Sequence, residues 1–121
     1  MAKKLEVGLG TLQQAAAEFL DVAKAVQRGE KPRARERLYF ADMATLLRTL
    51  TPERWRLLAY VSELGPLSVQ AVARGLGRNY KNVHGDVQRL CELGLLEKSE
   101  AGIEVPYQSI VAELKMERRA A

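Results

Sequence analysis

The residues that most often perform catalysis or bind metal ions are scarce in this sequence. It contains one histidine, His84, and one cysteine, Cys91. On a single helix these two residues would lie about 10 Å apart along the axis, too far for the hydrogen bond of a Cys–His nucleophilic pair. A zinc site needs three or four ligands, and no phosphate-loop, dinucleotide-binding or metalloprotease motif is present. The sequence therefore predicts neither an enzyme nor a cofactor or metal site.

The residue types that the sequence does offer suit recognition of DNA by one face of a helix. A helix predicted over residues 79–93 has its buried stripe at Val83, Val87 and Leu90. At about 100° per residue, the opposite face carries Lys81, Gly85, Gln88 and Glu92, and is flanked by Arg78, Asn82, His84 and Arg89. Lysine binds guanine acceptors or phosphates, the amides offer the donor and acceptor that adenine needs, and glycine allows close approach of the backbone. Any one of these side chains, taken alone, is also typical of a solvated helix face.

The full set of predicted DNA-binding residues is Ser68, Arg78, Asn79, Tyr80, Lys81, Asn82, His84, Gly85, Gln88, Arg89 and Lys98. The Tyr80 hydroxyl either touches a phosphate or its ring covers the core. His84 is expected at the flank of the interface or on a phosphate, because no second metal ligand lies nearby. Cys91 lies on the apolar side of its helix and is expected to be a buried structural thiol.

Capping signals place three helices and a hairpin in the second half of the chain. The helices are predicted to begin after Thr51, Ser68 and Asn79, and to end at Gly65-Pro66, Gly77 and Gly94. The last two helices are about three residues apart, with a glycine in the turn, as a helix-turn-helix requires. Strands predicted at 95–98 and 103–106 would form a hairpin directly after them. This order is typical of a winged helix, whose last helix enters the major groove.

The first part of the chain is predicted to be an extension of that domain. It comprises a short strand at 3–8, a helix from Thr11 to Gly29 with one apolar stripe, and a basic linker at 28–37. The linker is either a solvated connection or an arm that contacts phosphates, with Arg33 as one contact. We therefore expect two domains: 1–37, which carries dimerisation, and 38–121, the winged helix-turn-helix domain.

Within the second domain, residues 38–40 are either a strand or a buried anchor, and a helix follows at 43–50 with Asp42 as its cap. Residues 107–116 fit two patterns, a strand in which apolar residues alternate from Ile110 to Met116 and a helix with apolar residues at 107, 110, 111 and 114; of these we favour a turn followed by a strand. The expected fold class is mainly α with a small β component, a winged helix-turn-helix with an N-terminal strand–helix extension.

Composition narrows the class of protein further. The chain has 121 residues, 47% of them hydrophobic and 28% charged, and a net charge of +4. This mild basic excess is compatible with a polyanionic partner. No run is long and apolar enough for a membrane span, and residues 1–6 do not match a signal peptide. One cysteine excludes an internal disulfide and fits a reducing cytoplasm, where we expect the protein to act.

Five stretches carry a family resemblance: LTPERWRLL (50–58), LGPLSV (64–69), LGRNYKNVHGDV (76–87), LGLLE (93–97) and VPY (105–107). They resemble a prokaryotic family of small MarR-like winged helix-turn-helix regulators, over about residues 38–116. The resemblance implies a DNA-binding transcriptional regulator, usually dimeric. Some members are similar to antitoxins encoded beside a toxin, which would bind both the toxin and their own promoter.

Two departures from the family pattern bear on affinity. Members often carry a basic residue where this chain has Gly85. The hairpin, residues 95–106, has one lysine and three glutamates, a net charge of −2, unlike a wing that grips phosphates. Both features imply modest affinity, or a site that relies on a partner or on dimer avidity.

We therefore expect a homodimeric, sequence-specific repressor that binds double-stranded DNA, with the antitoxin of a cognate toxin as one form of it. A single recognition helix reads few bases, and operators mirror two-fold protein symmetry. The stripe of the N-terminal helix and the two terminal strands have no evident partner in a winged-helix core, so we expect them at the dimer interface. The alternative is a protein-interaction module whose winged helix does not read DNA, which the acidic hairpin also suits.

Overall fold

The computed structural model describes residues 3–30, 36–116 and 118, and these form five helices and five strands. They divide into two compact units, one made of Lys3 with residues 50–108 and the other of the described parts of 4–49 and 109–121. The fold is a mixed arrangement of helices and strands. No helix among the described residues is long and apolar enough to cross a membrane.

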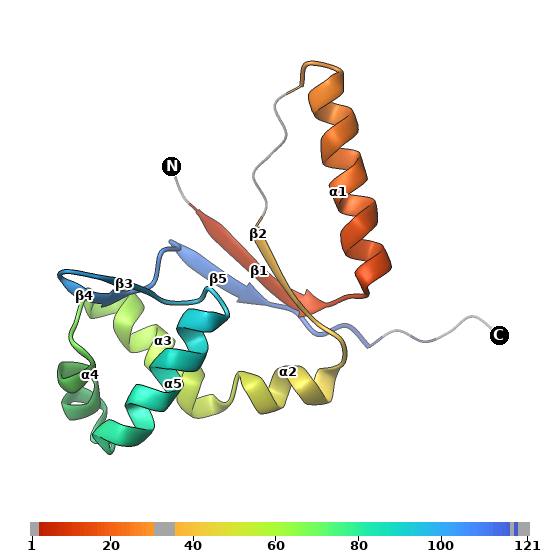
Figure 1. The fold of residues 1–121 in the computed structure, drawn as a ribbon. Coiled ribbons are helices and arrows are strands. Elements are labelled where there is room, and N and C mark those ends of the chain that lie inside the picture. The colour runs from red at the N-terminus through yellow and green to blue at the C-terminus, as the bar shows by residue number, and fades with distance from the viewer. Residues whose placement is uncertain (1–2, 31–35, 117, 119–121) are drawn as a thin grey trace. The chain divides into compact units, whose positions relative to one another are not determined.

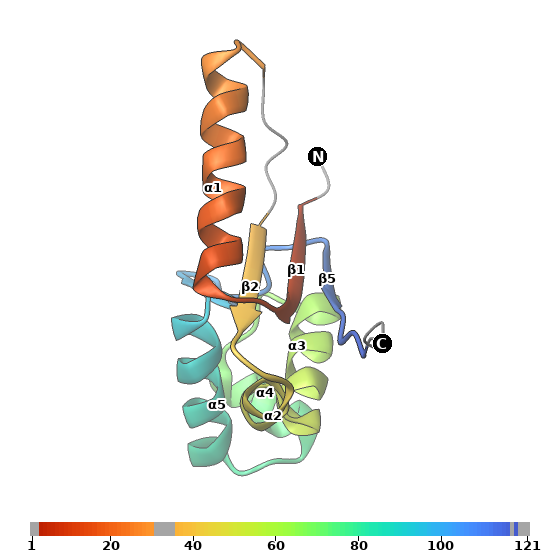
Figure 2. The same ribbon diagram turned by 90° about the vertical axis from the view of Figure 1, so that its right-hand side faces the viewer.

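The unit formed by 4–49 and 109–121 is built on a parallel sheet. Strand β1 (Lys4–Leu9) lies between β2 (Glu36–Phe40) and β5 (Ser109–Ala112), as Figure 1 shows. Both neighbours run parallel to β1, with Leu5 opposite Glu36 on one side and Ile110 on the other. The strand predicted at 3–8, the strand option at 38–40 and the strand after the 107 turn are all confirmed. In Figure 2 the three strands stand side by side.

Two helices complete this unit. Helix α1 (Leu12–Gln27) begins at Thr11, whose predicted capping box with Gln14 is present, and connects β1 to β2. Helix α2 (Met43–Thr49) contacts β1 and β2 and buries Leu46. The Asp42 carboxylate caps α2 by accepting from the Thr45 backbone N–H (2.7 Å), and this hydrogen bond lowers the pKa of Asp42. The prediction of a cap at Asp42 is confirmed.

The predicted domain boundary at residue 37 differs from the division in the structure. Parallel pairing with β1 draws β2, and α2 after it, into the unit that contains β1, and it brings β5 into the same unit from the C-terminal end. Sequence patterns report each strand separately but not its partners, because parallel strands are joined by long crossovers. Residues 31–35 of the predicted basic linker, including Arg33, lie outside the described residues, and its last two positions belong to β2.

The other unit packs three helices against a hairpin. The helices are α3 (Pro52–Leu64), α4 (Val69–Leu76) and α5 (Tyr80–Glu92), followed by strands β3 (Glu97–Ser99) and β4 (Gly102–Glu104). The predicted caps Thr51, Ser68 and Asn79 each accept a backbone N–H in the first turn. The core contains Leu57, Leu58, Val61, Val72, Val83, Val87, Leu90, Leu95, Leu96 and Ile103.

The hairpin is shorter than predicted and begins later. The structure places its strands at 97–99 and 102–104, rather than at 95–98 and 103–106. Leu95 and Leu96 are both buried, which an alternating strand with one solvated face does not allow. They belong to the core instead, and antiparallel pairing starts with Glu97 opposite Glu104.

Candidate nucleic-acid interface

The outer face of α5 is set by the three side chains that hold the helix to its unit. Val83, Val87 and Leu90 are fully buried. Because side chains of a helix advance by about 100° per residue, this anchoring turns Lys81 and Gln88 away from the core. Both are exposed, and no hydrogen bond or ion pair joins their side chains to another described residue. The face that the sequence predicts as outward is therefore outward in the structure.

The start of α5 is fixed by its connection to α4. Gly77 ends α4 in the left-handed region (φ 64°), and Asn79 begins the next helix. The Asn79 side chain accepts from the backbone N–H groups of Lys81 (2.9 Å) and Asn82 (3.4 Å). Helices α4 and α5, green and teal in Figure 1, pack on each other. The two helices and their turn thus form one packed corner, with the first turn of α5 directly after the turn.

Arg78, which the sequence analysis predicts to contact DNA, belongs to an ion-pair cluster that joins α3, the α4–α5 turn and α5. Asp86 accepts from Arg54 Nε (3.0 Å) and from Arg78 Nη2 (2.7 Å), while Arg78 Nε lies 3.6 Å from Glu53. The three side chains of the Asp86 pairs are only 16–21% exposed. Arg78 therefore holds α5 to α3 in this unit, and we leave it out of the proposed DNA contacts.

The remaining predicted residues fall into two groups. Ser68 caps α4, with its hydroxyl accepting from the Ala71 N–H (3.0 Å), and Arg89 forms an exposed ion pair with Glu92 (3.2 Å). The others keep accessible side chains: Asn82 is exposed, Tyr80 is half-exposed with its ring 5.9 Å from that of the half-buried His84, and Lys98 is exposed on β3 of the hairpin.

Gly85 lies in the middle of the exposed face. A Cβ atom at this position would meet no atom within 4 Å, and the backbone is not in the positive-φ region. Neither packing nor backbone conformation within the described chain requires glycine here. Glycine inside a helix costs about 1 kcal/mol relative to alanine.

Cys91 is half-buried, rather than fully buried as the sequence predicts. Desolvation raises the pKa of its thiol, which favours the unreactive protonated form. Among the described residues, no group of three or more His, Cys, Asp or Glu side chains gathers in a way that would hold a metal ion.

The hairpin brings two acidic residues together. Glu97 and Glu104 are direct partners in the antiparallel register, so their side chains lie on the same face. Like charges directly opposite each other destabilise a strand pair. The sequence predicts an acidic hairpin, and the register adds that two of its carboxylates are neighbours.

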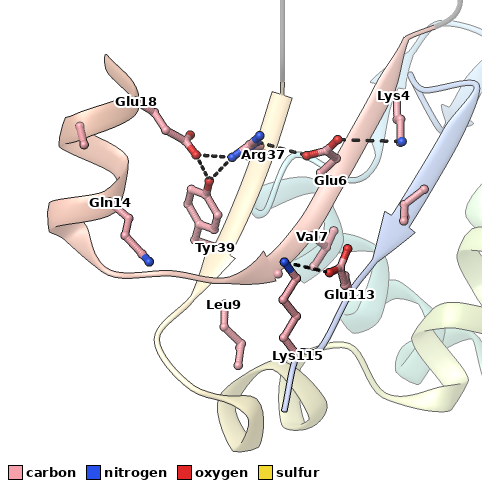
Figure 3. A pocket seen from close by; sticks show the side chains of 13 residues that line it. Lys4, Glu6, Val7, Leu9, Gln14, Glu18, Arg37, Tyr39, Glu113 and Lys115 are labelled. Carbon is pink, nitrogen blue, oxygen red and sulfur yellow. Dashed lines mark hydrogen bonds and ion pairs between the residues drawn. The ribbon is translucent and has the colours of Figure 1, made fainter. Parts of the chain in front are cut away.

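The other unit contains a polar pocket of about 680 Å³ between α1 and the sheet. Figure 3 shows Glu18, Arg37 and Tyr39 turned toward one another: Tyr39 donates to Glu18 (2.6 Å), and Arg37 donates to both Glu18 and Tyr39. The Tyr39 hydrogen bond, supported by the charges of Glu18 and Glu6, raises the pKa of Arg37. Each charged group shown in the pocket has an opposite charge beside it, so the lining is internally neutralised.

We compared the sequence with models of known protein families and with curated proteins. The model of the HVO_A0114 family matches residues 49–112, just over half of the chain. The matched segment includes α3, α4, α5, the hairpin and β5. No curated protein matches the sequence.

Proposed function

The chain belongs to the HVO_A0114 family, and we propose that it is a transcriptional regulator that binds double-stranded DNA through a winged helix-turn-helix of the MarR-like type. The observation that carries the proposal is the outer face of α5. Lys81, Gly85 and Gln88 lie there together, exposed and without partners among the described residues. In this proposal α4 and α5 are the helix-turn-helix, and β3 and β4 form the wing.

The chemistry of this face suits the major groove. The groove is about 12 Å wide and admits one helix. Lys81 lies in the first turn of α5, the part that normally meets bases, and its ammonium group can reach guanine acceptors or a phosphate. Gln88 offers the donor and acceptor that pair with adenine. Tyr80 and Asn82 lie on either side of Lys81 in this first turn, and in this proposal they contact phosphates.

We further propose that the regulator acts in the cytoplasm as a homodimeric repressor, because two-fold operators need two recognition helices. The antitoxin form of this role adds a cognate toxin as a second partner. It is the form that the acidic wing favours, since a wing of net charge −2 suits a basic protein better than a phosphate backbone.

Replacing Lys81 by alanine is expected to weaken binding to the operator by about 1–3 kcal/mol and to reduce discrimination against a scrambled duplex. The measurement is fluorescence anisotropy with a duplex from the chain's own upstream region, at several salt concentrations. Gln88→Ala is expected to reduce discrimination as well, with no change in salt slope.

Arg56→Ala is the matched control, since it removes one positive charge from an exposed side chain of α3. It should leave discrimination unchanged. If the protein binds no operator-sized fragment, or binds without salt dependence, the DNA-binding proposal fails.

Replacing Gly85 by alanine is expected to change stability and binding in opposite directions. The free energy of unfolding should rise by about 1 kcal/mol, because alanine is the better helix former and meets nothing within 4 Å. Operator affinity should fall, because the new methyl group stands where the backbone approaches DNA. Urea unfolding and anisotropy on the same preparation test both. Higher stability with unchanged affinity would show that DNA does not approach Gly85 closely.

The alternative function, a protein-interaction module, is favoured by one specific observation, the facing carboxylates of Glu97 and Glu104. A basic partner would relieve their repulsion. If this chain forms a stoichiometric complex with the product of the adjacent gene and binds no DNA, the result supports this alternative. If the chain forms this complex and also binds its own promoter, the result supports the antitoxin form.

A further inference from the structure

Helix α1 exposes a continuous apolar face. None of its residues is buried, and Leu12 and Phe19 are 87% and 73% exposed. At about 100° per residue, one arc of roughly 120° contains only apolar side chains. The residues in this arc, the α1 stripe, are Leu12, Ala15, Ala16, Phe19, Val22, Ala23 and Val26.

The sheet of the same unit does not cover the α1 stripe. The helix faces the sheet with Glu18, which pairs with Arg37 and Tyr39 of β2 (Figure 3). The centre of the stripe is turned about 100° from Glu18. The sheet face beside α1 is polar, because Glu6, Arg37 and Tyr39 alternate with the buried positions of β1 and β2. An exposed apolar surface of this length is typical of an interaction site.

We propose that the α1 stripe binds the α1 stripe of a second copy of this chain, with the two helices antiparallel and Phe19 on the two-fold axis. A two-fold interface requires that whenever residue i meets residue j, residue j meets residue i. The stripe satisfies this condition along its whole length. Its residues form pairs at equal distances from Phe19: Leu12 and Val26 at seven residues, Ala15 and Ala23 at four, and Ala16 and Val22 at three.

The charges of α1 are compatible with this register. The same symmetry about Phe19 places Glu18 opposite Leu20, Asp21 opposite Ala17 and Lys24 opposite Gln14 of the other copy. No charged residue of α1 therefore meets a like charge at its opposite position. The alanines on either side of Phe19 allow the helix axes to approach closely.

The size of the interface sets the expected affinity. A helix of 16 residues is about 24 Å long. Two such stripes bury on the order of 1,000 Å² together, the low end of specific interfaces. We therefore expect self-association with a micromolar Kd, and not a permanent dimer.

Sedimentation equilibrium of the full chain tests the pairing. At roughly 100 µM we expect twice the 13.5 kDa mass of the chain, and Phe19→Asp should return the monomer mass. Gln13→Asp is the matched control: it adds the same charge at an exposed residue of α1 outside the stripe, whose opposite position in this register is the uncharged Ala25, and it should still dimerise. Because α1 buries no side chain, neither variant should prevent folding, and circular dichroism checks this. A monomer at this concentration, or equal effects of the two variants, would overturn the proposal.

Disulfide trapping tests the orientation, in a Cys91→Ser background that removes the native thiol. Phe19→Cys should form a cross-linked dimer on mild oxidation. Leu12→Cys alone should not, but should cross-link when mixed with Val26→Cys. A dimer from Leu12→Cys alone would indicate parallel helices and overturn the antiparallel arrangement. The pairing does not depend on whether α5 binds DNA, so a dimer that binds no operator would refute the proposed function and leave this interface intact.

Discussion

Replacing Asp86 by alanine is expected to lower the free energy of unfolding by about 3 kcal/mol. Asp86 accepts from Arg54 (3.0 Å) and Arg78 (2.7 Å), and all three side chains are mostly shielded from water. Removing the carboxylate leaves two largely desolvated guanidinium groups without the charge that they share. Breaking a buried pair from one side is costly for this reason, whereas an exposed pair contributes little.

Glu92→Ala is the matched control for Asp86→Ala. It removes a carboxylate from the same helix, but Glu92 pairs with Arg89 at an exposed site. We expect a change within about 0.5 kcal/mol. Urea unfolding followed by the fluorescence of Trp55, the single tryptophan, reports on the unit that contains both residues. Equal effects of the two variants would mean that the cluster does not stabilise this unit.

Replacing Gly102 by alanine is expected to destabilise the same unit by about 3 kcal/mol or more. Gly102 has φ 128°, a backbone conformation that residues other than glycine rarely adopt. An added Cβ would lie 2.4 Å from the carbonyl oxygen of Leu67, a backbone atom that no side-chain rotation can move. Relieving this clash would separate Leu67 from Ile103, whose two backbone hydrogen bonds (2.7 and 3.0 Å) tie β4 to the residues before α4.

Gly94→Ala separates the effect of the strained backbone from the effect of the clash with Leu67. Gly94 also has positive φ (80°), but no atom lies within 4 Å of an added Cβ. Only the backbone strain should remain, about 1 kcal/mol. Thermal unfolding of the two variants measures the difference. If Gly102→Ala is no worse than Gly94→Ala, the backbone of Leu67 yields easily and the contact with Ile103 contributes little.

The candidate DNA face could be predicted from the sequence because it depends on one periodic pattern. Val83, Val87 and Leu90 repeat at helical spacing, so the opposite residues follow from the geometry of one helix. The role of Arg78 could not be predicted in this way, because its partner Asp86 belongs to a cluster completed by Arg54, 32 residues earlier. On the helical wheel Asp86 falls close to the buried stripe, and this is the signal that could have suggested a shielded carboxylate.

The sequence by itself determined where helices begin and end. Thr11, Ser68 and Asn79 cap the N–H groups next to them, and Gly77 supplies a left-handed residue, all interactions within a few positions along the chain. Only the tertiary structure decided that β2 and β5 both pair with β1, that Leu95 and Leu96 join the core, and that the α1 stripe is left uncovered by its own sheet. These outcomes depend on competition among distant segments for the same backbone groups and apolar surface, which no local pattern records.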